Sequence, residues 1–266
     1  MTRLFSFICM IFLTLLPSFA AAGSSEAGNP KLPQADVAAF ANRVQQDLAA
    51  RGANVAIVAR MGRDPAILPP GVQYTHVGFW VFSNIKRADG STGRGYQVYN
   101  LYQTPNDQSR SNLVQDTPAD FLAGAHRLDV GVIIPDVRLQ KKLLKVIASP
   151  TYSALHNPSY SVLSNPNTDQ FQNCTEHTLD IIMASIYGTK SKPQIKANIA
   201  AYFQPQQIRV GGIKRFLASA SSKAMTTEDH GPKVATATFG SISRFMSAHK
   251  LASEIYRITP GKVVGF

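Results

Sequence analysis

Residues 74–83 read YTHVGFWVFS, and this mixture of β-branched and aromatic residues is typical of a strand. Similar runs flank it, with NVAIVA at residues 54–59 and GYQVYNLYQ at residues 95–103. The pair Asp89-Gly90, between the second run and the third, is a hairpin signal. Together these segments predict three strands that pair antiparallel, and they decide the fold class.

The remaining pattern adds one strand and three helices. LDVGVII at residues 128–134 predicts a fourth strand. Apolar residues at helical spacing predict helices over residues 36–50, 135–148 and 174–187, the last of them ending at Gly188. We therefore expect an α+β fold in which helices pack on an antiparallel sheet.

The first 22 residues have the order of a secretory signal peptide. Arg3 precedes an apolar run over residues 4–19, and Ala20, Ala21 and Ala22 form an A-x-A cleavage site. We expect cleavage near Ala22, a flexible entry at residues 23–35, and a periplasmic or secreted mature chain. No later stretch approaches about 18 apolar residues, so we expect no transmembrane helix.

Positive charge is concentrated at the C-terminal end. The whole chain has 27 Lys and Arg against 16 Asp and Glu, whereas residues 190–266 hold 12 against 3. Such an end is either a solvated surface or a salt-sensitive contact with anionic cell-envelope material, peptidoglycan or lipid head groups. The basic side chains that we consider for this contact are Lys190, Lys192, Lys196, Lys214 and Arg215. No sequence motif indicates a nucleic-acid partner.

The chain has the length of one domain with an appendage. We expect a catalytic domain over residues 36–188. Residues 189–266 are expected to form a basic, mainly helical extension packed on the same domain. Within it, Phe239, Ile242, Phe245, Met246 and Ile255 lie near helical spacing.

Cys174 is the only cysteine left once the leader, which contains Cys9, is removed. Asn173, followed three residues later by Glu176, is a helix-start signature that places Cys174 at the first helical position. The helix N-terminus favours a thiolate there, and its N–H groups are able to stabilise an oxyanion. This polar setting favours a nucleophile over a small packing residue, and a redox-sensing thiol is a weaker alternative.

A cysteine nucleophile needs a base, and His76 is the best candidate because its strand gives rigid support. Gly78 beside it leaves room for a substrate. His177 lies one helical turn after Cys174 and is interpreted as a supporting residue, since a partner on the same helix points along it. The other histidines are interpreted as solvated or structural: His126, His156, His230 and His249.

The segments YTHVGFW and NCTEHTLD together resemble circularly permuted papain-like proteins, in which a strand histidine precedes a helix cysteine. Relatives of lecithin:retinol acyltransferase carry a similar Asn-Cys-Glu-His stretch, although Thr175 is an extra residue here. Over about residues 36–260 the chain resembles exported bacterial proteins catalogued as a domain of unknown function, related to peptidoglycan endopeptidases of the NlpC type. The resemblance implies a papain-like sheet with the cysteine-bearing helix packed on it, and it brings no established substrate.

A third polar residue usually orients the histidine in such sites. Gln97, Asn100 and Gln103 are the available groups, and the choice depends on the register of the hairpin. The resemblance selects Asn100. Around this catalytic set we place six substrate-binding or supporting residues, namely Asn173, His177, Gly78, Trp80, His156 and Tyr160.

These residues predict a cysteine-dependent hydrolase or acyltransferase that acts on an amide or ester, with cell-wall peptide as the favoured substrate. The alternative is a catalytically silent envelope-binding protein on the same scaffold. Cys174 and His177 have a ligand-like spacing, but the mature chain lacks a second cysteine for a closed zinc site, so we expect no metal and no cofactor.

Overall fold

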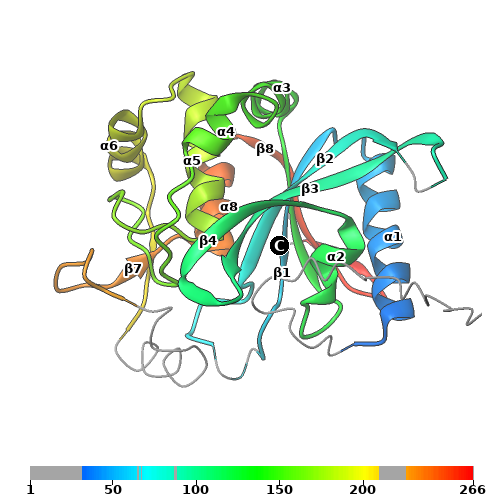
Figure 1. Cartoon of the computed structure of the whole chain (residues 1–266), viewed down its shortest axis with the longest axis horizontal. Helices are drawn as coiled ribbons and strands as arrows, with labels where there is room; N and C mark the ends of the chain where they lie inside the picture. Colours follow the sequence, from blue (N-terminus) through cyan, green and yellow to red (C-terminus); the bar gives the residue numbers. More distant parts are fainter. Residues whose placement is uncertain (1–31, 65, 67, 87–88, 210–225, 266) are drawn as a thin grey trace, which may run out of the picture.

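A seven-stranded antiparallel sheet forms the centre of the structure (Figure 1). The computed structural model describes residues 32–64, 66, 68–86, 89–209 and 226–265. The strands lie in the order β4-β3-β2-β1-β5-β8-β9. Their bounds are β1 Val55–Arg60, β2 His76–Lys86, β3 Thr92–Thr104, β4 Asp107–Asp116, β5 Val130–Pro135, β8 Ala252–Ile258 and β9 Val263–Gly265. A separate short pair joins β6 (Gln206–Gln207) to β7 (Ala235–Thr236).

Helices cover both faces of this sheet. One face, called the α1 face, carries α1 (Gln34–Ala50) and the short α2 (Pro118–Ala123). The other, called the α5 face, carries α3 (Val137–Ile147), α5 (Cys174–Tyr187) and α8 (Phe239–Ala248), with α4 (Pro150–Ala154) and α6 (Lys192–Tyr202) beside them. Figure 1 shows α1 on one side of the sheet and α5 with α8 on the other.

Alternation along the strands divides the apolar core into two clusters. In β2, Val77, Phe79 and Val81 belong to the cluster on the α5 face. Trp80, between them, belongs to the cluster on the α1 face. Each large side chain buried in this way contributes about 1.5–3 kcal/mol, so β2 is held firmly between the two helical layers.

The expected strands and helices are confirmed in type and approximate position. The four expected strands correspond to β1, β2, β3 and β5, and the helix from Cys174 to Tyr187 has both expected bounds. The α+β architecture with a large antiparallel sheet is therefore confirmed.

The C-terminal segment differs from the expected helical extension. Helix α8 ends at Ala248, and Lys250 adopts a left-handed φ of 53°. Ile255 lies instead in β8, which pairs with β5 inside the main sheet. The prediction that Ile255 continues the helix is wrong, because Ile255 pairs with Ile133 of β5 as part of a strand. The sheet thus includes strands from both sides of residue 189.

Some expectations fall outside the described residues. The signal peptide at residues 1–22 and most of the entry at residues 23–35 belong to this group, as do Lys214 and Arg215. Within the described part, no helix is long and apolar enough to cross a bilayer.

Candidate functional site

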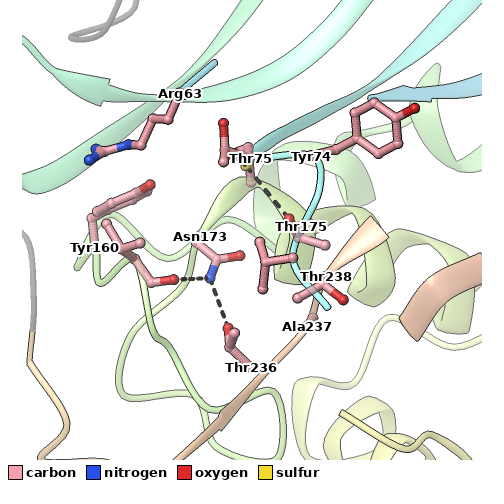
Figure 2. A pocket seen from close by; sticks show the side chains of 12 residues that line it. Arg63, Tyr74, Thr75, Tyr160, Asn173, Thr175, Thr236, Ala237 and Thr238 are labelled. Atoms are coloured by element: carbon pink, nitrogen blue, oxygen red, sulfur yellow. Dashed lines mark hydrogen bonds between the residues drawn. The ribbon is translucent and has the colours of Figure 1, made fainter. Parts of the chain in front are cut away.

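Cys174 lines a small cavity of about 50 Å³ at the N-terminal end of α5 (Figure 2). Separate segments of the chain meet around it. Figure 2 shows Tyr160 from the loop before α5, Thr236 from β7, and Arg63 from the segment after β1. The remaining lining residues are Val72, Tyr74, Thr75, Val162, Asn173, Thr175, Ala237 and Thr238. Hydroxyl, amide and guanidinium groups therefore surround the thiol.

The thiol is buried and has two polar atoms near it. Its Sγ atom lies 4.0 Å from the carbonyl oxygen of Thr75 and 3.8 Å from the Oγ1 atom of Thr175. Cys174 occupies the first position of α5, where backbone N–H groups lack intrahelical acceptors. The helix end favours a thiolate, whereas the Thr75 carbonyl accepts a hydrogen bond only from the protonated thiol.

Asn173 holds the start of α5 in place. Its Oδ1 atom accepts a hydrogen bond from the N–H of Glu176 at 2.9 Å, as a helix cap does. Its Nδ2 group donates to the carbonyl of Val162 at 3.1 Å and to the hydroxyl of Thr236 at 3.3 Å. One side chain thus fixes the helix, the preceding loop and β7 around the cavity.

The side chain of Glu176 belongs to a buried ionic cluster. The Nζ atom of Lys196 donates to Glu176 at 2.7 Å and to Asp180 at 2.9 Å. Burial raises the pKa of both carboxyl groups, and the ammonium of Lys196 opposes that shift. Lys196 therefore ties α6 to α5, and the prediction that it belongs to a basic surface is wrong.

His76 lies on the α1 face of the sheet, with its ring stacked on Tyr102 at a centroid distance of 4.7 Å. The ring also packs on Phe121 of α2 at 5.3 Å. Its Nε2 atom is 2.9 Å from the Oδ1 atom of Asn100. Because Gly78 pairs with Asn100, the register brings Asn100 rather than Gln97 or Gln103 to the histidine.

The hydrogen bonds of Asn100 fix the tautomer of His76. The Nδ2 group of Asn100 donates to the carbonyl of Val114 at 3.2 Å and to the carboxylate of Asp116 at 3.4 Å. Its Oδ1 atom therefore accepts, and Nε2 of His76 carries the proton. The Nδ1 atom keeps the lone pair, which is the arrangement that a base requires.

Burial keeps His76 neutral. Burial and the nearby positive charge of Arg60 lower the pKa of His76 to about 3, against the opposing effect of the Asn100 hydrogen bond. Asp116 completes the buried network, since it accepts a hydrogen bond of 2.7 Å from Tyr102. Burial raises the pKa of this carboxyl group.

The imidazole of His76 and the thiol of Cys174 belong to opposite faces of the sheet. The ring contacts α2, whereas Cys174 begins the helix on the other face. The sulfur is nevertheless close to the backbone of His76. Its Sγ atom is 4.0 Å from the carbonyl oxygen of Thr75, and a trans peptide places that oxygen about 3 Å from the next Cα atom, which is that of His76. The Cα atom of His76 therefore lies within about 7 Å of the sulfur.

Gly78 and Trp80 have packing roles. A Cβ atom at Gly78 would lie 3.0 Å from the Cβ atom of Asn100 and 3.3 Å from the ring of Phe121, so glycine permits close packing rather than leaving room for a substrate. Trp80 is fully buried and packs edge-on against Phe121 at 5.8 Å. Trp80 was expected near a substrate, but it lies in the apolar core.

His156 and His177 lie together on the α5 face, with ring centroids 6.2 Å apart. The Nε2 atom of His156 is 3.0 Å from the hydroxyl of Ser111. His177 is almost fully buried against Tyr152, and neither of its ring nitrogens has a hydrogen-bond partner among the described residues. Burial lowers the pKa of His177 to about 3. Tyr160 is the remaining expected residue, and it lines the Cys174 cavity.

Several residues around Cys174 and His76 could not be identified from the sequence alone. Arg63, Thr236 and Thr238 reach the cavity from segments far apart in the chain. Arg60 and Asp116 join the His76 network from β1 and β4, and their types alone did not mark them. Among the described residues, no group of three or more His, Cys, Asp and Glu is placed to hold a metal ion.

Comparison with known proteins gives a family. Searches of curated proteins and of solved structures found no match. Residues 47–246 match the model of a family described as uncharacterized proteins conserved in bacteria (DUF2145), and this range is more than half of the chain. The protein therefore belongs to the DUF2145 family of bacteria.

Proposed function

We propose that this protein is an exported cysteine-dependent hydrolase or acyltransferase that acts on an amide or ester, with Cys174 as its nucleophile. The observation that carries the proposal is the position of Cys174, at the first turn of α5 and on the wall of a cavity whose lining includes Arg63 and several threonines. Free N–H groups at the helix start favour the thiolate and offer donors to an oxyanion. Cell-wall peptide is the favoured substrate.

We propose that the fold of this chain is a circularly permuted papain-like fold. In the chain, the strand histidine precedes the helix cysteine, and α5 packs on the central strands of an antiparallel sheet. The hydrogen bond between His76 and Asn100 supports this relationship, because it leaves Nδ1 as the acceptor. The resemblance to NlpC-type and lecithin:retinol acyltransferase-like proteins rests on the sequence motifs.

His76 is proposed as the general base, acting after a rearrangement at the start of β2. In the structure described here the ring is stacked on Tyr102, on the face opposite to the thiol. The Cβ atom of a strand residue is fixed on one face of the sheet, so rotation about the side-chain bonds alone does not carry the ring across. His76 is the first residue of β2, and a turn of the backbone there is required to bring Nδ1 toward the sulfur.

A second candidate function follows from the same observation. If the ring remains on the α1 face, Cys174 lacks this base, and the chain is a catalytically silent envelope-binding protein. The buried stacking of His76 on Tyr102 and Phe121 favours this alternative.

The alkylation rate of Cys174 by iodoacetamide at pH 6 separates the two candidates. The proposal predicts a rate at least about tenfold above that of glutathione, because more of the thiol is ionised. It also predicts that His76→Ala slows the reaction, while His249→Ala, at an exposed histidine, does not. A rate no faster than glutathione, unchanged by His76→Ala in a folded variant, supports the silent protein.

A further inference from the structure

A groove of about 510 Å³ lies between α3 and the C-terminal end of α5. Helix α5 has 14 residues, so at about 1.5 Å per residue this groove is roughly 20 Å from Cys174. The groove is therefore a surface distinct from the cavity of the proposed nucleophile, and neither site shares a lining residue with the other.

The charge in this groove has a single sign. Lys142 and Lys145 of α3 and Lys190 after α5 line it, and all three are exposed. Its lining includes no Asp or Glu. The Nζ atom of Lys142 donates to the carbonyl of Ile186 at 3.1 Å, so one ammonium group is held over the end of α5. The positive electrostatic potential of these lysines attracts an anionic ligand.

An exposed aromatic pair borders the groove. Tyr187, which lines it, is 45% exposed, and Tyr202 of α6 is 53% exposed. Their rings are stacked, with centroids 6.1 Å apart and planes inclined by 22°. Large exposed aromatic side chains that gather in one place mark interaction sites more often than scattered ones do. Their flat faces suit the C–H face of a sugar ring.

The lining supplies a third kind of group. Thr151 and Thr189 bring hydroxyl groups to the groove, and such groups form hydrogen bonds with the hydroxyls of a sugar. The last turn of α5 adds less, because the carbonyl of Ile186 already accepts from Lys142 and that of Ala184 from the N–H of Thr189. This combination favours a ligand with many hydroxyls over a nucleic acid, although nucleic acids also use stacking and positive charge.

We propose that this groove binds an anionic glycan, with the lysines on its carboxylate or phosphate groups and Tyr187 against a sugar ring. The proposal does not depend on chemistry at Cys174. It replaces a diffuse basic C-terminal surface with one defined place, in which Lys145 and Lys190 are exposed and Tyr187 provides an aromatic face. A concave groove of this kind holds a chain segment, whereas a bilayer surface contacts protruding groups.

The test is calorimetric titration of the mature protein with oligogalacturonate, a uronate glycan, at about 0.1 M and about 1 M salt. The proposal predicts binding that weakens at the higher salt as the Debye length falls to about 3 Å. Lys145→Gln/Lys190→Gln and Tyr187→Ser should each weaken binding by about tenfold or more. A matched control, Lys250→Gln/Lys262→Gln, changes two exposed lysines elsewhere and should bind as the wild type does.

Parallel titrations distinguish the other ligand classes. Neutral dextran and polyglutamate should bind at least about tenfold more weakly than oligogalacturonate, since each lacks one of the two features. Equal binding of polyglutamate, preference for anionic vesicles or single-stranded DNA, or indifference to the groove substitutions in folded variants overturns the proposal. Cys174→Ala should keep full glycan binding, so failure of the nucleophile and failure of this groove are separate results.

Discussion

The Nε2 atom of His76 lies 2.9 Å from the Oδ1 atom of Asn100, on the face of the sheet opposite to the helix of Cys174. This bond has the donor and acceptor assignment that a papain-like site uses, since Nδ1 retains its lone pair. The position of the ring, by contrast, is that of a buried core residue. The proposed catalysis therefore requires a rearrangement at the start of β2 that carries the His76 ring to the face of the thiol.

Gly78 should be intolerant of a side chain. A Cβ atom there lies 3.0 Å from Asn100 and 3.3 Å from Phe121, and overpacking of this kind costs about 1–3 kcal/mol. Gly78→Ala should lower the urea midpoint, whereas Gly261→Ala, which has open space around it, should not. A Gly78→Ala variant as stable as the wild type contradicts the packing described for His76 and Asn100.

His177 should make the protein sensitive to acid. Its pKa is about 3 in the folded state and about 6.5 in an unfolded chain. As the pH falls below about 6.5, the unfolded chain takes up a proton that the folded chain does not, so stability is lost down to about pH 3. In urea unfolding, the free energy of unfolding of the wild type should fall between pH 7.5 and pH 5 by about 2 kcal/mol more than that of His177→Phe.

His249 provides the control for this measurement, because it is exposed. His249→Gln should leave the difference between the two pH values unchanged. An unaltered pH dependence in His177→Phe is the result that rules out a buried neutral His177.

Lys196 should be essential for stability at neutral pH. Lys196→Met leaves Glu176 and Asp180 without their ammonium partner, and breaking a buried ion pair in this way costs about 3–5 kcal/mol. The carboxyl pKa values are then raised further in the folded state, so the folded chain holds protons that the unfolded chain releases. The stability of Lys196→Met relative to the wild type should therefore fall as the pH rises above about 4.5.

Neutral replacements of the two carboxylates should rescue this variant. Lys196→Met/Glu176→Gln/Asp180→Asn should recover most of the lost stability at pH 7, measured by urea unfolding. A loss of stability in Lys196→Met, relative to the wild type, that is no larger at pH 7 than at pH 4.5 is incompatible with the buried cluster.

The sequence pattern predicted the inner part of the sheet because those strands carry dense β-branched and aromatic runs. The edge strand β4 escaped notice, since DQSRSNLVQD is largely polar and half of its residues are exposed. Ile255 belongs to β8 rather than to the helix that ends at Ala248, and it lies nine positions after Met246, which is half a turn out of phase on a helix. Pairing with β5 decides the matter, and only tertiary structure supplies that partner.

The candidate site was predictable as a set of residues but not as an arrangement. Asn173 and Cys174 follow from local helix-start chemistry, which acts over a few residues. The face on which His76 lies depends on the hairpin register, in which Lys86 pairs with Thr92. A shift of one residue reverses that face.

Catalysis and folding should separate at Cys174. This side chain is small, so Cys174→Ala should cost only about 1 kcal/mol in urea unfolding. A collapsed Cys174→Ala variant makes the cysteine a packing residue instead, and this check must precede any interpretation of lost reactivity.

The most direct test of the proposed nucleophile is mass spectrometry of a chain that begins at Gly23, after brief exposure to p-nitrophenyl acetate. The thiolate attacks the ester carbonyl, p-nitrophenolate leaves, and a thioester forms on the sulfur. The account predicts one acetyl group on Cys174, located by peptide mapping, and none at that position in folded Cys174→Ala. No adduct on the folded wild type, or the same total labelling in Cys174→Ala, contradicts it.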